Sequence, residues 1–349
     1  MASTLPEPPS DGISALAFIP GTAISRAHER HLVAAASWDR SVRVYDAAAR
    51  APVATVPISD PATGLAWSPI PGPHTVYTTT ARGAVLALDL ASFAVTPIGA
   101  HTDGTGLRCV SVAPAAAPDA GTVYTGGWDG KVCAWDPRAA TRSVSPVATR
   151  DVPGSVWAMD LAPETAAAPL LVVATASGAI LELDRRFLTG DPLAVRDSPL
   201  KYPTRTVACT PDGSGFALAS TEGRIQLEAA ATAAAAAARR FAFKCHRVTR
   251  DGTEFVYPVN AIAFHPRHPM TFASGGADGT VGLWDGIKRK RIRLLLKDQP
   301  TSISSLSFSA DGDMIAAAVS YTWERGSCPH PPDSIVVRPF TDADVRSKK

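Results

Sequence analysis

The sequence predicts an all-β protein of 349 residues, in which seven four-stranded sheets form the blades of a single propeller over residues 1–349. Two repeating patterns predict this fold. One is a β-hairpin of constant form that recurs along the chain, and the other is a short strand-like run before each blade. The hairpins recur at intervals of roughly 43 to 56 residues, near or above the ~40 to 45 residues of a four-stranded blade.

The hairpins share a β-rich run, a turn with Asp or another small polar residue beside Gly or Arg, and an alternating run that ends near Asp. The clearest copies are AAASWDRSVRVYD (34–46), TGGWDGKVCAWD (125–136) and SGGADGTVGLWD (274–285). Weaker copies, TTTARGAVLALD (78–89), ATASGAILELD (174–184) and ASTEGRIQLE (219–228), keep the turn and lose the tryptophan. Tight turns between alternating apolar runs are typical of β-hairpins.

Seven short apolar runs mark the beginning of each blade. They are ISALAF, TGLAWSP, LRCVSVAP, VWAMDLAP, RTVACTPDG, NAIAFHP and ISSLSFSADG. The last is followed by MIAAAVSY and SIVVRPF, which we interpret as the remaining strands of the last blade. The approximate blades are residues 11–50, 60–97, 101–141, 152–190, 199–245, 257–297 and 301–345. Seven blades can close into a ring that leaves only short, protected edges.

The copies have the form of WD repeats, in which four residues of a blade typically form a hydrogen-bonded structural tetrad. In the third blade His101, Thr125, Asp129 and Trp135 occupy these positions, and we interpret them as residues that hold the blade together. Trp135 and Trp284 lie inside alternating runs. A large apolar ring in a strand is more often core than binding site, so we expect both to be buried.

Two stretches interrupt the repeats. Residues 228–240 (EAAATAAAAAARR) are nearly all alanine. About ten residues without an apolar face form only a marginal helix, so we expect a surface loop. Residues 321–332 (YTWERGSCPHPP) contain a glycine and three prolines and cannot be a central strand, so we expect a long loop within the seventh blade.

Composition and charge argue against several classes of protein. A formal net charge of +2 gives no strong field for nucleic acid or a membrane surface. Five singly spaced cysteines match neither a disulfide framework nor a zinc site. The beginning, MASTLPEPPSDG, lacks the pattern of a secretory signal, and no later apolar run approaches ~20 residues. We therefore expect an intracellular protein outside the membrane, with no metal and no cofactor.

Catalytic motifs are missing from the sequence at any usable spacing. There is no P-loop, no G-x-S-x-G, no H-E-x-x-H and no C-x-x-C. We therefore expect no catalytic residue and no enzymatic activity. The basic run KRKRIR (288–293) fits a solvated connector between blades or, alternatively, a segment for nuclear import or phosphate binding.

Cations in and beside the fifth blade suit a negatively charged partner. Lys201 and Arg205 lie with Tyr202 in LKYPTR, Arg224 lies in TEGR, and Lys244 and Arg247 lie in FKCHR. Because strand ends gather on the two faces of a propeller, we expect these side chains to converge on one patch; scattered, solvated charge is the alternative. The planar fork of arginine binds carboxylate or phosphate in a bidentate pair.

A more specific resemblance is carried by segments that include connections between blades. They are PPSDGISALAF, SWDRSVRVYD, GGWDGKVCAWDPR, LKYPTR, FAFKCHR, YPVNAIAFHP, GGADGTVGLWD, KRKRI, PTSISSLSFS and HPPDSIVVRPFTDAD. In these segments the chain resembles the WD-repeat mitotic checkpoint proteins of the budding-uninhibited-by-benzimidazole family. The third to fifth blades and the alanine run are the least family-like, and the second, fourth and fifth blades lack the closing WD dipeptide.

The resemblance implies a non-enzymatic adaptor of the spindle assembly checkpoint, in the nucleus, at the kinetochore in mitosis and also in the cytoplasm. Such proteins bind GLEBS motifs, which are short, acidic and otherwise disordered, in checkpoint kinases and pseudokinases. The complex docks on phosphorylated threonine motifs of a kinetochore scaffold. It supports inhibition of the anaphase-promoting complex by the mitotic checkpoint complex.

The resemblance also implies which residues bind these partners. The expected peptide-binding residues are Trp38, Trp128, Tyr202, Arg205 and Arg224, and the expected phosphothreonine-binding residues are Arg224 and Lys244. Both tryptophans precede a turn Asp, where the chain reaches the surface, and exposed aromatic anchors are typical hot spots. Packing within the turn is the alternative. The alanine run separates Arg224 from Lys244, which leaves their relative position open.

Two other functions compete with the checkpoint adaptor. The first is that of the sister propeller of messenger-RNA export, which sits at nuclear pores and binds a nucleoporin GLEBS motif. The segments YPVNAI, KRKRI, PTSISSL and TDAD favour the checkpoint member. The second is direct nucleic-acid binding, which requires a basic face and a steep salt dependence. A net charge near zero argues against it.

Overall fold

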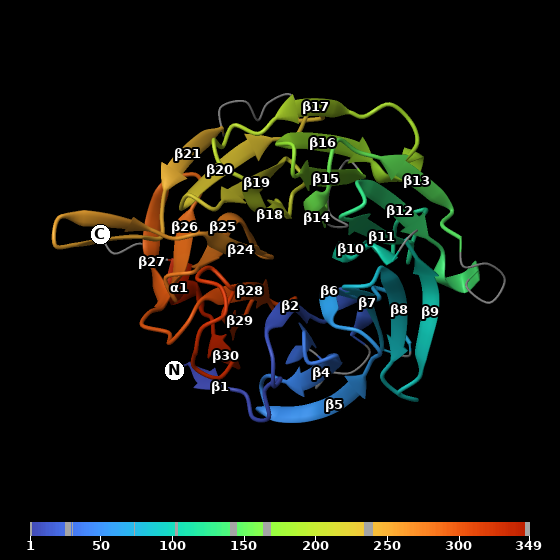
Figure 1. Ribbon diagram of the computed structural model, residues 1–349, viewed down its shortest axis with the longest axis horizontal. Helices are drawn as coiled ribbons and strands as arrows, with labels where there is room; N and C mark the ends of the chain where they lie inside the picture. The colour runs from blue at the N-terminus through green and yellow to red at the C-terminus, as the bar shows by residue number, and fades with distance from the viewer. Residues whose placement is uncertain are drawn as a thin grey trace.

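The computed structural model describes residues 2–24, 29, 31–72, 74–101, 104–139, 145–162, 169–233 and 240–345. Within these residues the chain forms seven four-stranded antiparallel sheets and one separate two-stranded hairpin. Figure 1 shows the seven sheets arranged as blades around a common centre. The prediction of an all-β, seven-bladed WD-repeat propeller is confirmed.

Each blade has four strands, which lie side by side in order from the centre of the ring outward. The first blade contains β2 (Ile13–Phe18), β3 (Leu32–Ser37), β4 (Ser41–Asp46) and β5 (Ala51–Pro57). The second contains β6 (Ala62–Trp67), β7 (Thr75–Thr80), β8 (Ala84–Asp89) and β9 (Val95–Ala100). The third contains β10 (Leu107–Val112), β11 (Val123–Gly127), β12 (Lys131–Trp135) and β13 (Ala148–Asp151). The fourth contains β14 (Val156–Leu161), β15 (Leu170–Thr175), β16 (Ala179–Asp184) and β17 (Ala194–Asp197).

The remaining blades follow the same order. The fifth contains β18 (Thr204–Cys209), β19 (Gly215–Ser220), β20 (Arg224–Ala229) and β21 (Phe241–Lys244). The sixth contains β24 (Val259–His265), β25 (His268–Gly276), β26 (Val281–Asp285) and β27 (Lys290–Leu296). The seventh contains β28 (Ile303–Phe308), β29 (Met314–Val319), β30 (Ser334–Pro339) and β1 (Ser3–Thr4). The hairpin β22 (Arg247–Arg250) and β23 (Thr253–Val256) lies between the fifth and sixth blades in the chain.

Helical structure is confined to short segments in the described part of the chain. They include α1 (Asp342–Val345) and the 3-10 turns η1 (Gly21–Ala23), η4 (Pro137–Ala139) and η5 (Arg185–Phe187). None of the helices among the described residues is long and apolar enough to cross a membrane.

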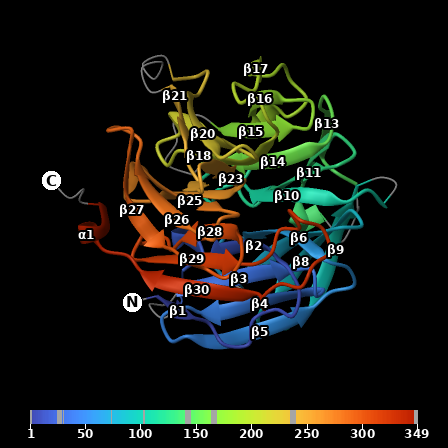
Figure 2. The same cartoon turned by 60° about the vertical axis from the view of Figure 1, so that its left-hand side comes forward.

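The ring closes where the first blade meets the seventh. Each inner strand contacts the inner strand of the next blade, and the last contact joins β28 to β2. The outermost strand of the seventh blade is β1, from the N-terminal segment, which pairs antiparallel with β30 (Figure 2). Leu5 continues this contact, because its backbone N–H donates to the carbonyl of Ile335 at 2.8 Å and its side chain is buried. The sequence patterns predicted β29 and β30 but not this two-residue strand.

The first four blades extend further along the chain than predicted. The predicted ends of the first, third and fourth blades were residues 50, 141 and 190, whereas their outer strands end at Pro57, Asp151 and Asp197. The outer strands β13 and β17 have four residues each and alternate half-buried with exposed side chains. Strands this short give little periodic signal beside the hairpins that precede them.

The core lies between neighbouring blades, so the second strand of a blade is covered on both faces. Every residue of β3, β15, β19 and β29 is buried. Strands buried on both faces have continuous apolar runs, as in LVAAAS and MIAAAV. The small alanine side chains in these runs let adjacent sheets pack closely.

The two irregular stretches differ in outcome. Residues 321–332 are a loop between β29 and β30, as predicted. The prediction for residues 228–240 is wrong at its beginning, because Glu228 and Ala229 belong to β20 and both are buried. Tertiary pairing with β19 overrides the low strand propensity of alanine there. Residues 234–239 of the expected loop lie outside the described residues.

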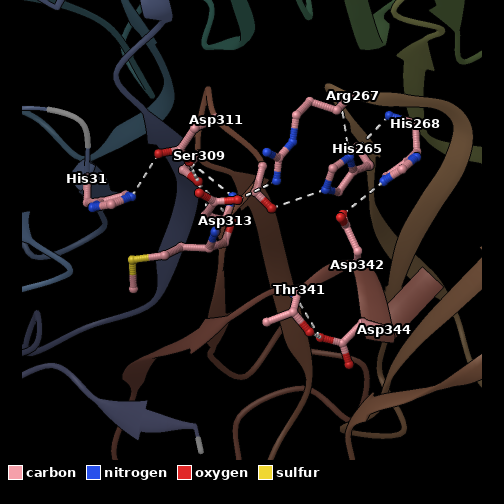
Figure 3. Close-up of polar contacts among 12 residues, drawn as sticks. His31, His265, Arg267, His268, Ser309, Asp311, Asp313, Thr341, Asp342 and Asp344 are labelled. Carbon is pink, nitrogen blue, oxygen red and sulfur yellow. Dashed lines mark hydrogen bonds and ion pairs between the residues drawn. The ribbon is translucent and has the colours of Figure 1, made fainter. Parts of the chain in front are cut away.

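Polar contacts join the sixth, seventh and first blades at the end of the ring where the β28–β29 turn lies (Figure 3). His31 of the first blade contacts Asp311 of that turn, with Nε2 and Oδ2 3.1 Å apart. Arg267 of the sixth blade pairs with Asp313. The β28–β29 turn is therefore held from both sides: by the sixth blade, which precedes it in the chain, and by the first blade, where the ring closes.

His265, at the end of β24, is buried in this region (Figure 3). Its Nε2 lies 3.1 Å from the carbonyl oxygen of Gly312, and its Nδ1 lies 3.2 Å from the backbone N–H groups of Arg267 and His268. A carbonyl only accepts and an N–H only donates, so the ring is neutral with its proton on Nε2. Burial lowers the pKa of His265 to about 4.

Candidate functional site

The second residue of every inner strand breaks the pairing register of its blade. These β-bulges lie between the first and third residues of β2, β6, β10, β14, β18, β24 and β28. A bulge re-aims the side chain at that position. The seven residues, which we call the bulge ring, are Ser14, Thr63, Arg108, Trp157, Arg205, Asn260 and Ser304. All seven line one cavity at the centre of the propeller, and all but Trp157 line a second one of about 450 Å³.

The bulge ring carries two positive charges and no carboxylate. Arg205 Nε donates to Asn260 Oδ1 at 3.2 Å, and Arg108 Nη1 donates to the carbonyl of Thr63 at 3.4 Å. Within the residues that the structure describes, neither arginine forms an ion pair. Burial, and after it the charge of Arg108, lowers the pKa of the Arg205 guanidinium. Because arginine still stays protonated, an anion entering the ring is stabilised by both guanidinium groups.

Sequence reasoning found Arg205 and missed Arg108 and Asn260. The signal was present, because LRCVSV, TRTVAC and VNAIAF are corresponding inner strands with these residues in the second position. Only closure of the ring brings the three blades around one cavity, so the spacing of these residues along the chain does not show that they lie together. Aligning the seven inner runs residue by residue identifies the seven positions of the bulge ring.

Trp38 and Trp128 lie at the mouth of the larger cavity, in the β3–β4 and β11–β12 turns. Their side chains are 45% and 40% exposed, whereas Trp135 and Trp284 are buried, as expected. Trp128 lies against the backbone of Gly106, where a Cβ would come within 2.5 Å of its ring. The two tryptophans therefore present apolar surface beside the arginines of the bulge ring.

Arg224 and Lys244 lie on the same face, further from the centre. They are directly opposite each other in the β20–β21 pairing, so the alanine run between them does not separate them. Neighbouring strands lie about 4.8 Å apart, which places Arg224 about 10 Å and Lys244 about 14 Å outward from the strand of Arg205. Arg224 Nε lies 3.5 Å from Glu222 Oε1, and Lys244 is exposed. The predicted patch is thus two groups, one central and one peripheral.

Tyr202 and Arg247 do not belong to either group. Tyr202 is exposed, does not line the central cavity, and has the ammonium of Lys201 5.9 Å from its ring centroid. Arg247 Nη1 pairs with Glu254 at 2.9 Å, and its Nη2 donates to the carbonyl of Glu222 at 2.8 Å. Arg247 therefore fixes the β22–β23 hairpin to the β19–β20 turn.

His101, Thr125, Asp129 and Trp135 form one hydrogen-bonded chain in the third blade. Trp135 Nε1 donates to Thr125 Oγ1 at 2.8 Å, and Thr125 Oγ1 lies 2.8 Å from His101 Nε2. His101 Nδ1 lies 2.9 Å from Asp129 Oδ2. Since the carboxylate accepts, His101 donates from Nδ1 and accepts from Thr125 at Nε2. Burial lowers the pKa of His101, against the opposite effect of Asp129.

The sixth blade contains a second chain of this kind, which sequence reasoning missed. Trp284 Nε1 donates to Ser274 Oγ, which lies 2.8 Å from His246 Nε2, and His246 Nδ1 lies 2.9 Å from Asp278 Oδ1. Ser274, Asp278 and Trp284 have the spacing of the corresponding residues in the third blade. That shared spacing is the signal that identifies the second tetrad.

The basic run at residues 288–293 is partly engaged by its surroundings. Arg293 Nη1 pairs with Asp344 at 3.1 Å, and the guanidinium of Arg289 lies 4.9 Å from the ring centroid of Phe241. The pairing of Arg293 ties β27 to α1. The interpretation of the run as a connector between blades is wrong for residues 290–293, which belong to β27, the outermost strand of the sixth blade; only Lys288 and Arg289 lie in a turn, between β26 and β27.

Parts of the chain match the family model described as WD domain, G-beta repeat, over residues 2–46, 94–136 and 243–285. The chain is 37% identical over 330 residues to the mitotic checkpoint protein bub3 of Dictyostelium discoideum, covering 95% of this chain and 92% of that protein. It is 39% identical over 348 residues to the mitotic checkpoint protein BUB3.1 of Arabidopsis thaliana, covering 99% and 94%. It is also 32% identical over 363 residues to the Poly(A)+ RNA export protein of Schizosaccharomyces pombe, covering 98% and 91%.

Proposed function

The chain belongs to the WD-repeat family of BUB3-type mitotic checkpoint proteins, and from this premise we propose that its central cavity binds an acidic GLEBS motif of a checkpoint kinase or pseudokinase. In this proposal the protein is a non-enzymatic adaptor. The motif is disordered when free and becomes ordered on the rigid face of the propeller, a known mode of recognition.

The observation that carries the proposal is the pair of arginines in the bulge ring. Arg108 and Arg205 line both central cavities, and within the described residues neither forms an ion pair, although Asp11 also lines the larger cavity and the charge of Glu324 acts on Arg205. An acidic side chain of the motif pairs with these guanidinium groups, and the guanidinium fork binds it with directional hydrogen bonds. Trp38 and Trp128 add apolar contact at the mouth, which suits aromatic hot-spot residues.

Arg224 and Lys244 support a second subsite, for a phosphorylated threonine of the kinetochore scaffold. A phosphothreonine carries a charge of about −1.5 to −2 and three acceptor oxygens. Two cations directly opposite each other on β20 and β21 match that charge. Because this pair lies outward from Arg205, kinase motif and scaffold motif bind side by side on one face. The adaptor thus brings the kinase to the kinetochore and contributes to the mitotic checkpoint complex that acts on the anaphase-promoting complex.

The RNA-export relatives provide the competing candidate, an adaptor at the nuclear pore that binds a nucleoporin GLEBS motif. Acidic motifs of either origin fit the bulge ring. The higher identity to the checkpoint relatives favours the checkpoint role. Affinity purification from mitotic cells separates the two: recovery of a checkpoint kinase supports the proposal, and recovery of a nucleoporin without a kinase supports the export role.

Isothermal titration with a synthetic GLEBS-type peptide tests the site directly. Arg205→Ala removes one partner of the proposed buried charge pair, which costs about 2–5 kcal/mol of binding free energy, or at least about thirtyfold in Kd. Arg138→Ala is the matched control, because it removes an exposed arginine that follows β12 at the opposite end of its blade. Equal affinity of the Arg205 variant and the wild type would move the site elsewhere, and no binding by the wild type would contradict the proposed function.

A phosphorylated scaffold peptide tests the second subsite. We expect the wild type to bind it and to bind its unphosphorylated form much more weakly. The double variant Arg224→Ala, Lys244→Ala is expected to lose this preference while it still binds the GLEBS-type peptide. Loss of both ligands together would show that the two groups of cations form one site.

A further inference from the structure

Trp323 is an exposed tryptophan that neither the repeat pattern nor the proposed motif residues account for. It lies in the loop between β29 and β30, its side chain is 63% exposed, and its φ is +62°. A bulky residue rarely adopts this left-handed conformation unless its surroundings impose it. An exposed aromatic ring in a costly backbone conformation suggests a binding role.

The loop around Trp323 is held by its own hydrogen bonds. The hydroxyl of Tyr321 donates to the carbonyl of Gly326 at 3.0 Å and accepts from the backbone N–H of Arg325 at 2.8 Å. The ring of Tyr321 is buried and stacks on Trp323, with centroids 6.4 Å apart and planes 28° apart. Trp323 is therefore preorganised, which lowers the entropy cost of using it as a contact.

The same loop is connected to the bulge ring. Asn260 Nδ2 donates to Thr322 Oγ1 at 3.3 Å, and the Oδ1 atom of the same amide accepts from Arg205 Nε. Ser302 Oγ donates to Glu324 Oε1 at 2.6 Å, which fixes the residue that follows Trp323. One amide thus links the guanidinium of Arg205 to the residue before Trp323.

Trp323 lines the cavity of about 450 Å³ together with Trp38, Trp128, Arg108 and Arg205. The tryptophans come from the first, third and seventh blades, so three blades contribute apolar surface to the cavity that contains the two charges. We propose that Trp323 is a third aromatic anchor, which binds a large apolar side chain of the acidic segment close to the carboxylate held by Arg205. This inference rests on the proposed function and adds that the partner needs an apolar residue beside its acidic ones.

A double-mutant cycle between Trp323 and the peptide tests the proposal. The peptide pair consists of a GLEBS-type peptide with a leucine or phenylalanine beside its acidic residues and the same peptide with alanine at that position. We expect Trp323→Ala to raise the Kd of the first peptide at least about tenfold and that of the alanine peptide less than about threefold. Trp323→Phe is expected to restore most of the affinity.

Phe93→Ala is the matched control, because Phe93 is 53% exposed, has a φ of +56° and lies in the β8–β9 turn away from the cavity. It is expected to bind both peptides as the wild type does. An unchanged Kd for Trp323→Ala, or equal losses for both peptides, would overturn the inference and leave the proposed function intact. No binding of either peptide by the wild type would contradict the proposed function, and the inference with it.

Discussion

Replacing Thr125 by valine removes one hydroxyl from the tetrad of the third blade without changing the shape of the side chain. Thr125 is fully buried, and its Oγ1 accepts from Trp135 Nε1 and donates to His101 Nε2, both at 2.8 Å. The variant leaves both groups buried without a partner. Each such group costs about 1–3 kcal/mol, so the free energy of unfolding should fall by about 2–6 kcal/mol.

Urea unfolding followed by tryptophan fluorescence measures this loss. Thr125→Ser is the control, because it keeps the hydroxyl and removes one methyl group, at about 1 kcal/mol. Ser274 already fills the equivalent position of the sixth blade with the same two hydrogen bonds. If valine proves no more destabilising than serine, the tetrad does not hold the blade together and the reasoning is refuted.

Three further changes test the closure, the pH dependence and the packing of the ring. Leu5→Ala should cost about 2–5 kcal/mol in chemical unfolding, because Leu5 is buried where the N-terminal segment completes the seventh blade; a loss under 1 kcal/mol would contradict that closure. The pKa of His265 is 6.5 in the unfolded chain and about 4 in the folded chain, so the unfolded chain binds the proton first as pH falls. The free energy of unfolding should therefore fall by about 2 kcal/mol from pH 7 to pH 5. His265→Gln should reduce that pH dependence, and parallel stability profiles of variant and wild type would contradict the assignment. Gly99→Ala places a Cβ 2.1 Å from the ring of Trp135, so it should lower the free energy of unfolding by about 1–3 kcal/mol and the melting temperature with it. The control Gly21→Ala, whose Cβ would make only ordinary contacts, should leave the melting temperature unchanged. Equal effects of the two substitutions would count against the clash.

The number and type of the blades followed from the sequence because each blade repeats its own local signals. Seven inner runs and their hairpins identify the strands without knowledge of the tertiary fold. The pairing of β1 with β30 was missed, since a two-residue strand has no periodicity and its partner lies at the other end of the chain. Outer strands such as β13 were missed for a related reason, because four alternating residues resemble a loop.

The candidate site was only partly predictable, for a geometric reason. Arg205, Arg224 and Lys244 lie close in sequence, so a local cluster of cations identified them. Arg108 and Trp323 come from the third and seventh blades, and only the closed ring places them beside Arg205. Tyr202 lies next to Arg205 in the sequence but does not line the central cavity, and its role in peptide binding stays a prediction.

A charge-neutralising cycle between Arg205 and the acidic residue of the peptide tests the central claim most directly. Arg205→Gln, a glutamate-to-glutamine peptide and their combination are each titrated against the wild-type pair. Close charge pairs across an interface couple by at least about 1.5 kcal/mol, so the second change should cost little once the first is present. Additive losses would show that Arg205 does not bind that carboxylate and would contradict the proposed role of the bulge ring.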